Sequence, residues 1–232
     1  VLLGDAMKKR AAKLKTDTSV RSQATELIST LSPDIVQAGI RRLRKVDPIL
    51  KEVIDRVGPF QLKLTKNRYH SLARAIVAQQ ISTAAARSIW KRLENLTAPK
   101  ALTADAIIVL ADEHLRGAGL SPQKLRYFRD LALRVADGRL PLTKLPKMSD
   151  EAVIEALVEV TGIGAWTAQM FLIFSLGRAD VFAPDDYGLR AAIKNLYSLE
   201  VLPNRALALQ IAEPWQPYRS IASWYLWRSL EQ

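Results

Sequence analysis

The feature that most constrains this chain is a Gly-Ile-Gly sequence at residues 162–164, placed between two segments with helical hydrophobic spacing. Glycine accepts a positive φ and lets another backbone approach closely, so two glycines here favour a tight hairpin between short helices. A third helical segment begins directly after the acidic pair Asp185 and Asp186. The sequence therefore predicts one helical arrangement that contains both the hairpin and the acidic pair.

Helix-start signals recur along the rest of the chain. Ser, Asp or Asn at the N-cap, often with proline at the first helical position, predicts the start of a helix. Such starts occur at Ser32, Asp47, Asn67, Ser82, Ser121 and Ser149. No segment alternates as a surface strand does, apart from a short extended piece at 62–64, and no repeat period is present. The predicted fold class is all-α, in a single unit over residues 1–232.

The charge balance of the chain favours a polyanionic partner. Its 34 Lys and Arg residues outnumber its 23 Asp and Glu residues, which gives a formal net charge of +11. The segment 56–93 contains eight basic residues and no acidic one. Residues 1–18 are also basic, and we expect a flexible, solvated segment there, because runs of like charge usually stay in water.

Cysteine and histidine usage excludes several kinds of site. The chain has no cysteine, which rules out disulfides, a cysteine nucleophile, thiolate zinc sites and Cys-ligated iron–sulfur clusters. With only two histidines, a multi-histidine metal site is not expected either. No apolar run reaches membrane-spanning length, and no secretory signal opens the chain. We therefore expect a monomeric intracellular protein, in the cytoplasm or nucleoid of a bacterium or the nucleus of a eukaryote, without a required cofactor.

The hairpin has two interpretations. Backbone N–H groups at a helix N-terminus suit a phosphate oxygen, and such a grip positions nucleic acid without reading its sequence. The alternative is a plain connector between two helices, because many Gly-x-Gly turns hold no ligand. The candidate DNA-binding residues of the hairpin are Thr161, Gly162, Ile163, Gly164 and Thr167.

The acidic pair also has two interpretations. Aspartate before a helix is usually an N-cap, so we expect one of Asp185 and Asp186 to cap and the other to stay free. A carboxylate beside a polyanion is unfavourable unless it meets developing positive charge, as in the oxocarbenium-like transition state of N-glycosidic cleavage. Neither histidine lies in this segment to serve as a general acid. A leaving base that is already cationic needs no proton, so an alkylated purine would suit such a site.

Aromatic residues gather in the segment 215–227, which holds three of the five tryptophans. A nucleotide flipped out of a duplex needs aromatic faces around its base, and electron-rich rings favour a cationic base. The alternative is a helix that buries these rings in the core. The candidates for a base pocket are Trp166, Tyr187, Trp224 and Trp227. Arg219, flanked by aromatics, is a candidate for a DNA contact or for a structural role.

The segment 76–83, IVAQQIST, predicts a junction between two helices with no acidic residue nearby. Enzymes that extrude a base or bend DNA often fill the gap in the stack with a side chain, and Gln80 or Ile81 is placed to do so. Ser82 is expected to cap the next helix and to contact DNA from there. The alternative is a capped turn without a wedge.

Four segments together resemble the helix-hairpin-helix superfamily of base-excision DNA glycosylases, and within it the DNA-3-methyladenine glycosylase II group. They are IVAQQISTAAA, LRGAGLSPQK, VTGIGAWTAQMFLIFSLGRADVFAPDDYGLR and WQPYRSIASWYLW, in the family's order from Ile76 to Trp227. The resemblance implies an all-α fold with two helical lobes flanking a DNA-binding cleft. It places one lobe at about 19–65 plus 200–232, and a helical barrel at about 66–199 with the hairpin at 160–168.

The resemblance also implies the roles of site residues. The family's essential aspartate, hairpin glycines, base-stacking tryptophan and wedge correspond to Asp186, Gly162 with Gly164, Trp227, and Gln80 or Ile81. Relatives that also nick the strand carry a lysine where this chain has Trp166, so the resemblance implies no lyase step. Many relatives carry a four-cysteine cluster, which this chain lacks. In some relatives the hairpin carbonyls hold a cation, so a monovalent or divalent ion there is an expectation.

The sequence therefore predicts a monofunctional DNA glycosylase of base excision repair. It would flip 3-methyladenine or 7-methylguanine out of double-stranded DNA, hydrolyse the N-glycosidic bond and leave an abasic site. Two alternatives stay open, a non-catalytic helix-hairpin-helix DNA-binding module and a glycosylase for another lesion class or with lyase activity. The acid next to the hairpin argues against a simple binder, because a module that only holds phosphates would gain from a basic or neutral residue there.

Overall fold

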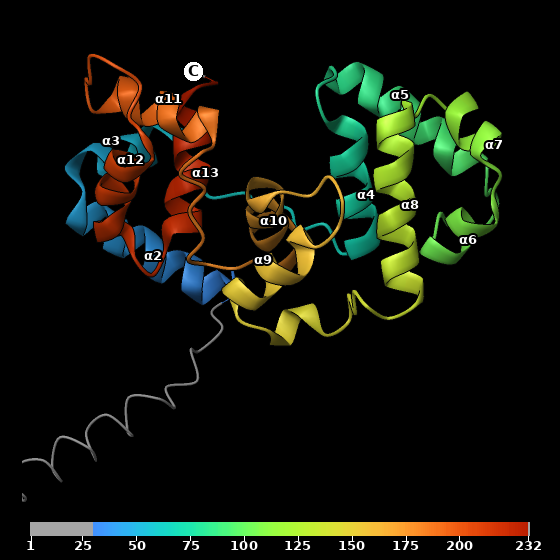
Figure 1. Ribbon diagram of the computed structural model, residues 1–232. Helices are drawn as coiled ribbons and strands as arrows, with labels where there is room; N and C mark the ends of the chain where they lie inside the picture. Colours follow the sequence, from blue (N-terminus) through green and yellow to red (C-terminus); the bar gives the residue numbers. More distant parts are fainter. Residues whose placement is uncertain (1–29, 232) are drawn as a thin grey trace, which may run out of the picture.

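A computed structural model describes residues 30–231, and within them the chain is almost entirely helical (Figure 1). Among these residues the only β-type pairing is one bridge between Thr30 and Arg178, and the extended piece at 62–64 forms no strand. The all-α prediction is confirmed. The basic segment 1–18 lies outside the described residues. Within residues 30–231, no helix is both long and apolar enough to cross a lipid bilayer.

Turns and loops of different lengths connect the helices, the longest at 58–67 and 177–186. In chain order the first are α2 (Pro33–Val46), α3 (Pro48–Val57), α4 (Arg68–Ala78), α5 (Thr83–Asn95), α6 (Ala104–Val109), α7 (Asp112–Gly117) and α8 (Pro122–Ala136). They are followed by the 3₁₀ turn η1 (Leu145–Lys147), α9 (Asp150–Val158), α10 (Ala165–Phe171), the π-helical turn η2 (Leu172–Leu176), α11 (Tyr187–Leu196), α12 (Arg205–Ala212), the 3₁₀ turn η3 (Glu213–Trp215) and α13 (Arg219–Ser229).

Helices start where the capping residues predict. The side chain of each predicted N-cap accepts a hydrogen bond from a backbone N–H in the first turn, at Ser32, Asp47, Asn67, Ser82, Ser121 and Ser149. Hydrophobic spacing does not predict α6 and α12, because helices of six and eight residues are too short to show a clear period. Thr103 and Asn204 nevertheless cap them in the same way.

Two hydrophobic cores organise these helices. The first lies among α4, α5, α6, α8, α9 and α10, in the middle and on the right of Figure 1, and buries Leu72, Phe128 and Leu157. The second lies among α2, α3, α11, α12 and α13 on the left, around the fully buried Trp215 and Tyr225. Burying one large apolar side chain contributes about 1.5–3 kcal/mol, so each core stabilises its own group of helices.

The second core joins segments from both ends of the described chain. Leu43 and Leu50, from α2 and α3, belong to the same cluster as Leu189 and Ile193 of α11. The prediction grouped α11 with the barrel at 66–199, whereas its buried residues lie in the second core. The helical spacing of Leu189 and Ile193 gives α11 one apolar stripe, and α13 packs against this helix.

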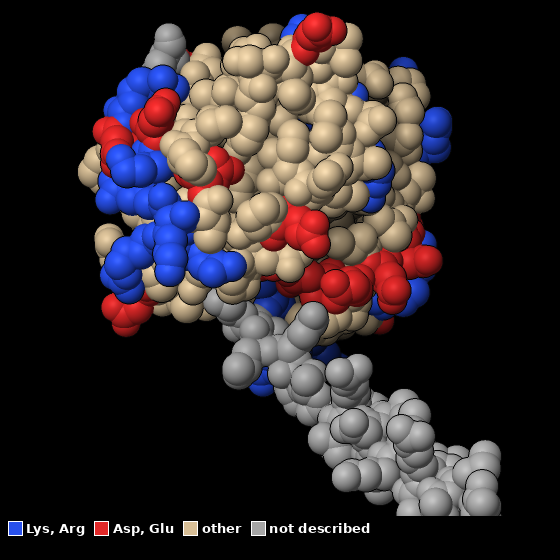
Figure 2. All heavy atoms as spheres, turned by 90° about the vertical axis from the view of Figure 1, so that its left-hand side faces the viewer, with Lys and Arg blue, Asp and Glu red and all other residues tan. Residues whose placement is uncertain are grey.

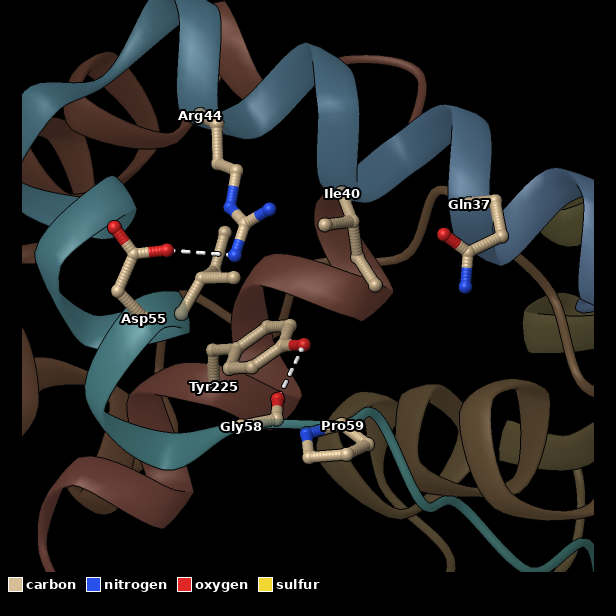
Figure 3. Close-up of a pocket in the computed structure, with 8 residues that line it drawn as sticks. Gln37, Ile40, Arg44, Asp55, Gly58, Pro59 and Tyr225 are labelled. Carbon is tan, nitrogen blue, oxygen red and sulfur yellow. Dashed lines mark hydrogen bonds and ion pairs between the residues drawn. The ribbon is translucent and has the colours of Figure 1, made fainter.

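The outer face of the second core carries a basic area, on the left in Figure 2. The exposed basic side chains of α2 and α3 are Arg41, Arg42, Arg44, Lys45, Lys51 and Arg56. A hollow of about 340 Å³ lies between these helices (Figure 3), where Arg44 pairs with Asp55 at 2.6 Å. At its floor the Tyr225 hydroxyl donates to the Gly58 carbonyl at 3.0 Å. Both interactions drawn in Figure 3 therefore join groups that line this hollow.

Asp47 is the polar centre of the second core. Its Oδ1 accepts from the backbone N–H groups of Ile49 and Leu50, both at 3.0 Å. Its Oδ2 accepts from Trp215 Nε1 at 2.8 Å and from the Tyr197 hydroxyl. Burial raises the pKa of Tyr197 and its hydrogen bond to Asp47 raises it further, so the phenol stays protonated and donates. One carboxylate thus caps α3 and satisfies two interior donors.

We expect Asp47→Ala to lower the free energy of unfolding by about 3 kcal/mol, because α3 loses its cap and two interior donors lose their acceptor. The matched control is Asn204→Ala, which removes an N-cap with one exposed hydrogen bond, to Leu207 N at 2.9 Å, and should cost about 1 kcal/mol. Urea denaturation followed by circular dichroism measures both. Equal losses would show that Asp47 acts only as a helix cap.

Candidate active site

The carboxylate of Asp186 is held by N–H donors from three helices. Its Oδ1 accepts from Leu189 N at 2.8 Å, which caps α11, and from Trp227 Nε1 of α13 at 2.9 Å. Its Oδ2 accepts from Trp166 Nε1 of α10 at 2.7 Å. Asp186 is only 8% exposed, so these donors replace water around its negative charge. The group is fixed in place by both cores and carries no basic ion-pair partner among the residues described.

The two aspartates differ from the expected division of labour. The prediction was that one caps the helix and the other is free for chemistry. Asp186 both caps α11 and lies against two indoles, whereas Asp185 is exposed and pairs with Arg205. A carboxylate has two oxygens with two lone pairs each, so one group has the capacity for several donors at once. The residue singled out by family resemblance is therefore also the cap.

Two hollows lie along the helices that hold this carboxylate, and Asp186 itself lines neither of them. Trp227 packs against Phe174 with ring centroids 5.5 Å apart, and both rings line a hollow of about 550 Å³ with Trp224. A second hollow of about 290 Å³, between α4 and α10, is lined on its α10 side by Thr167, Met170 and Phe171, and also by Phe174 of η2. The indole of Trp166 is 48% exposed. The indoles of Trp166 and Trp227 therefore place aromatic rings next to the Asp186 carboxylate, and the larger hollow also has the charged residues Lys63, Arg228 and Glu231 in its lining.

The four predicted pocket aromatics do not lie in equivalent places. Trp166 and Trp227 both touch Asp186. Tyr187 follows Asp186 directly but is 73% exposed, so its ring lies in solvent. Trp224 is 6% exposed and packs against Phe60 with ring centroids 4.8 Å apart, which makes it chiefly a core residue, as the alternative interpretation held.

The hairpin between α9 and α10 is locked from one side by α8. Gly162 has φ +85°, and a Cβ there would lie 2.2 Å from the ring of Tyr127. The N–H of Thr161 donates to Asp130 Oδ2 at 2.7 Å. Burial alone would raise the pKa of Asp130, but the bonds from Thr161 and Arg134 hold it below its ordinary value. The hairpin is thus a fixed structure before any ligand arrives.

The opposite side of the hairpin is open. Gly164 is the exposed N-cap of α10, has no side-chain cap, and would have no atom within 4 Å of an added Cβ. The backbone N–H groups of Ala165 and Trp166 follow it in the first turn, where intrahelical acceptors do not exist. Thr167 and Ile163 are buried at 7% and 4% exposure, so their side chains do not face this open side. The donors available to a ligand are backbone groups.

The junction between α4 and α5 projects from the surface. Gln80 is exposed and has φ +56°, a conformation that few non-glycine residues adopt. Ile81 is 37% exposed, and Ser82 caps α5 by accepting from Ala85 N at 3.2 Å. The predicted cap is confirmed. Both wedge candidates are accessible, and we name residues 79–82 the wedge turn.

Arg219 has a structural role in this fold. Its guanidinium donates to both carboxylate oxygens of Asp180, at 2.8 and 2.9 Å, and to the Asp180 backbone carbonyl at 3.1 Å. These bonds tie the start of α13 to the loop that leads to Asp186. The structure thus gives Arg219 the structural role that was one of its two interpretations, while its Nη1 makes none of these bonds.

Several residues around the site carry no sequence signal. Gln79 donates to the Gly162 carbonyl at 2.7 Å, and Lys124 donates to the Val77 carbonyl at 2.7 Å. Together with Tyr127 and Asp130, they link the wedge turn, the hairpin and α8. Because Trp166 then links the hairpin helix to Asp186, one chain of direct contacts runs from the wedge turn to the carboxylate. These contacts connect a hairpin, an exposed turn and a buried carboxylate. This combination defines a DNA-processing enzyme of the helix-hairpin-helix class.

Comparison with known proteins identifies the family. Residues 73–217 match the model of the HhH-GPD superfamily base excision DNA repair proteins, and the chain belongs to this superfamily. It is 31% identical over 192 residues to DNA-3-methyladenine glycosylase 1 of Schizosaccharomyces pombe, covering 81% of this chain and 84% of that protein. A relative from Bacillus subtilis is 35% identical over 179 residues, and the chain spans 61% of that protein's length.

Solved structures agree with this assignment. The S. pombe 3-methyladenine DNA glycosylase in complex with abasic DNA superposes with a TM-score of 0.77 at 30% identity, over 84% of this chain and 97% of that one. The DNA-3-methyladenine glycosidase of Bacillus halodurans also gives a TM-score of 0.77, at 36% identity, over 85% and 89% of the two chains. The predicted family and its helix-hairpin-helix fold are confirmed.

Proposed function

We propose that this protein is a monofunctional DNA glycosylase that removes alkylated purines, such as 3-methyladenine and 7-methylguanine, from double-stranded DNA and leaves an abasic site. The observation that carries the proposal is the Asp186 carboxylate, which accepts from the indole N–H groups of Trp166 and Trp227, while the Trp227 ring also lines a hollow of about 550 Å³. The names of the S. pombe and B. halodurans relatives support the same substrate class. The protein would act as a monomer.

The chemistry follows from the placement of the charge. As the N-glycosidic bond breaks, its electron pair leaves with the base and positive charge develops on the sugar. Asp186 would stabilise that charge and orient the water that adds to the sugar carbon, while the water's proton passes to solvent. Because fixed N–H donors hold the carboxylate, little reorganisation is needed at the moment of reaction.

The preference for alkylated bases follows from the lack of a proton donor. The groups that contact Asp186 are a backbone N–H and two indole N–H groups, none of which releases a proton at neutral pH. A base that already carries positive charge leaves as a neutral molecule without protonation. Such a base would also gain from stacking on the ring of Trp227, because an aromatic face attracts a cation.

A lyase step is not part of the proposal. A bifunctional enzyme needs an amine to attack the sugar and form a Schiff base. Trp166 stands where bifunctional relatives carry that lysine, and it donates to Asp186 instead. The protein should therefore yield no covalent adduct with damaged DNA under borohydride.

The hairpin would bind the DNA backbone through N–H groups at the start of α10, helped by the basic segment 56–93. The S. pombe relative bound to abasic DNA supports duplex DNA as the partner. No cofactor is required by the chemistry. A cation at the hairpin carbonyls stays part of the proposal, and it would have to share or avoid the Gly162 oxygen that Gln79 already engages. Within residues 30–231, no cluster of three His, Cys, Asp or Glu residues offers another metal site.

The test is base release from methylated duplex DNA, with the freed bases identified by chromatography and strand breaks measured before and after alkali. Release of methylpurines, with breaks only after alkali, is the expected result. Tight, salt-sensitive binding with no release of any base would favour a non-catalytic clamp. Release of deaminated or oxidised bases in place of methylpurines would move the enzyme to another lesion class.

The indole of Trp227 offers a further prediction. Trp227→Phe keeps an aromatic ring beside Phe174 but removes the N–H that donates to Asp186 at 2.9 Å. We expect the single-turnover rate to fall about tenfold, since a hydrogen bond to a charged group contributes about 1.5–3 kcal/mol. Trp224→Phe is the control, because Trp224 does not touch Asp186, and it should change stability more than rate. Equal rate losses in both variants would argue against a role for the Trp227 N–H.

A further inference from the structure

One side-chain contact joins the two elements proposed to hold DNA. Gln79, the C-cap of α4, donates from its amide nitrogen to the carbonyl oxygen of Gly162 at 2.7 Å, across 83 residues of sequence. Among the residues described, no other hydrogen bond runs directly between the wedge turn and the hairpin. The donor residue is next to the wedge candidate Gln80, and the acceptor lies within the hairpin that is proposed to bind phosphate.

The wedge turn has little internal support. Its backbone bonds are long, at 3.4 Å from Gln79 N to Ile76 O and 3.5 Å from Ile81 N to Ala78 O. Gln80 adopts φ +56°, and holding a non-glycine residue there costs about 1 kcal/mol or more. A turn with weak internal bonds and an unfavourable φ keeps its shape only if neighbouring groups fix it.

Those neighbours are the hairpin and one face of α8. Lys124 donates to the Val77 carbonyl at 2.7 Å, near the end of α4. One turn further along the same face, Tyr127 lies against Gly162, and a further turn on, Asp130 accepts from Thr161 N. Helix α8 therefore contacts both the hairpin and the last turn of α4, which leads into the wedge turn, at positions three residues apart. The hydrogen bond from Gln79 to Gly162 then joins the wedge turn directly to the hairpin.

We propose that Gln79 is a positioning residue that fixes the wedge turn against the hairpin. The wedge side chain and the phosphate-binding N–H groups of the hairpin are then held at a fixed distance from each other. This inference rests on the proposed function but concerns DNA distortion rather than bond cleavage. Without the Gln79 bond, the hairpin still binds backbone and the wedge still exists, but the two are no longer held at a set separation. Base extrusion then becomes less frequent while ordinary DNA binding persists.

The experiment uses Gln79→Met, which keeps the length of the side chain and removes the donor, and Gln79→Lys, which restores a donor. Gln210→Met, at an exposed position of α12, is the matched control. The probe is a duplex that carries a tetrahydrofuran abasic analogue opposite 2-aminopurine, whose fluorescence rises when a wedge disturbs its stacking. This readout needs no base release, so it tests the positioning role of Gln79 even if the enzyme acts on another lesion.

We expect Gln79→Met to reduce the fluorescence change and the single-turnover rate about five- to tenfold, with affinity for undamaged duplex within twofold of wild type. Gln79→Lys should recover most of both losses, and Gln210→Met should match wild type. The proposal is overturned if Gln79→Met leaves the fluorescence change within twofold. It is also overturned if affinity for undamaged DNA and the melting temperature fall in parallel with it, since that pattern reports general loss of structure.

Discussion

Replacement of Asp186 by asparagine is expected to reduce base release from methylated DNA by about 10³-fold or more, while affinity for duplex DNA stays the same or rises slightly. In the proposed mechanism, removing the negative charge takes away the group that stabilises the developing positive charge on the sugar. The same change removes a repulsion between the carboxylate and the phosphates, which is why binding does not suffer. Single-turnover release and filter binding at a fixed salt concentration measure the two effects separately.

The geometry makes this substitution more severe than a simple loss of charge. An amide has one acceptor oxygen, whereas three N–H groups converge on the carboxylate of Asp186, from Leu189, Trp166 and Trp227. The amide nitrogen would face at least one indole N–H, so that two hydrogen-bond donors would point at each other. We therefore expect one tryptophan to move, which near-ultraviolet circular dichroism would detect.

Asp185→Asn is the matched control for this experiment. The two aspartates are adjacent, but Asp185 is exposed and its partner is Arg205 on the surface. An exposed ion pair contributes about 0–1 kcal/mol, so the rate should stay within a few-fold of wild type. Near-normal release by Asp186→Asn, or an equal loss in Asp185→Asn, would remove Asp186 from its proposed role.

The second large effect is expected for Gly162→Ala. The φ of +85° is costly for a residue with a side chain, and the new Cβ would lie 2.2 Å from the ring of Tyr127. Together these should lower the free energy of unfolding by about 2–4 kcal/mol and weaken DNA binding at least about tenfold. Thermal melting and fluorescence anisotropy with a labelled duplex measure the two losses.

Gly164→Ala separates stability from binding. Its backbone has φ −98° and an added Cβ meets nothing within 4 Å, so the melting temperature should hardly change. DNA affinity should still fall, because the methyl group would stand where a phosphate approaches the start of α10. In the Gly162→Ala background, Tyr127→Ala should recover the part of the loss due to the clash but not the part due to φ. A neutral Gly162→Ala would contradict the locked hairpin.

Local signals predicted the parts of this site that depend on a few neighbouring residues. The N-caps at Ser82 and Ser149 and the glycine hairpin at 162–164 follow from side-chain size and hydrogen-bonding capacity at single positions, and the structure has them there. The motif around Asp186 was recognisable as a whole because several short segments occur in the family's order. Such features are encoded within about one helical turn of sequence.

Long-range partners were beyond prediction. Arg219 could not be assigned from its aromatic neighbours, because its true partner, Asp180, lies 39 residues away. The pairing of Gln79 with Gly162 spans 83 residues and depends on how α4, α8 and the hairpin pack. The predicted division of roles between Asp185 and Asp186 was wrong for a related reason. Counting caps assumes one task for each carboxylate, whereas packing of α10 and α13 gave Asp186 several donors at once.

The two-core layout has a consequence for how the protein is made on the ribosome. The first core uses residues from 69 to 181 and can close as soon as that stretch has emerged. The second core packs Leu43 and Leu50, which are synthesised early, with Trp215 and Tyr225, which are synthesised late. The apolar faces of α2 and α3 therefore lack their packing partners during most of translation. Asp186 can accept the hydrogen bond from Trp227 only after α13 has been synthesised. A nascent chain would therefore carry a complete hairpin well before the Asp186 carboxylate has all of its hydrogen-bond donors.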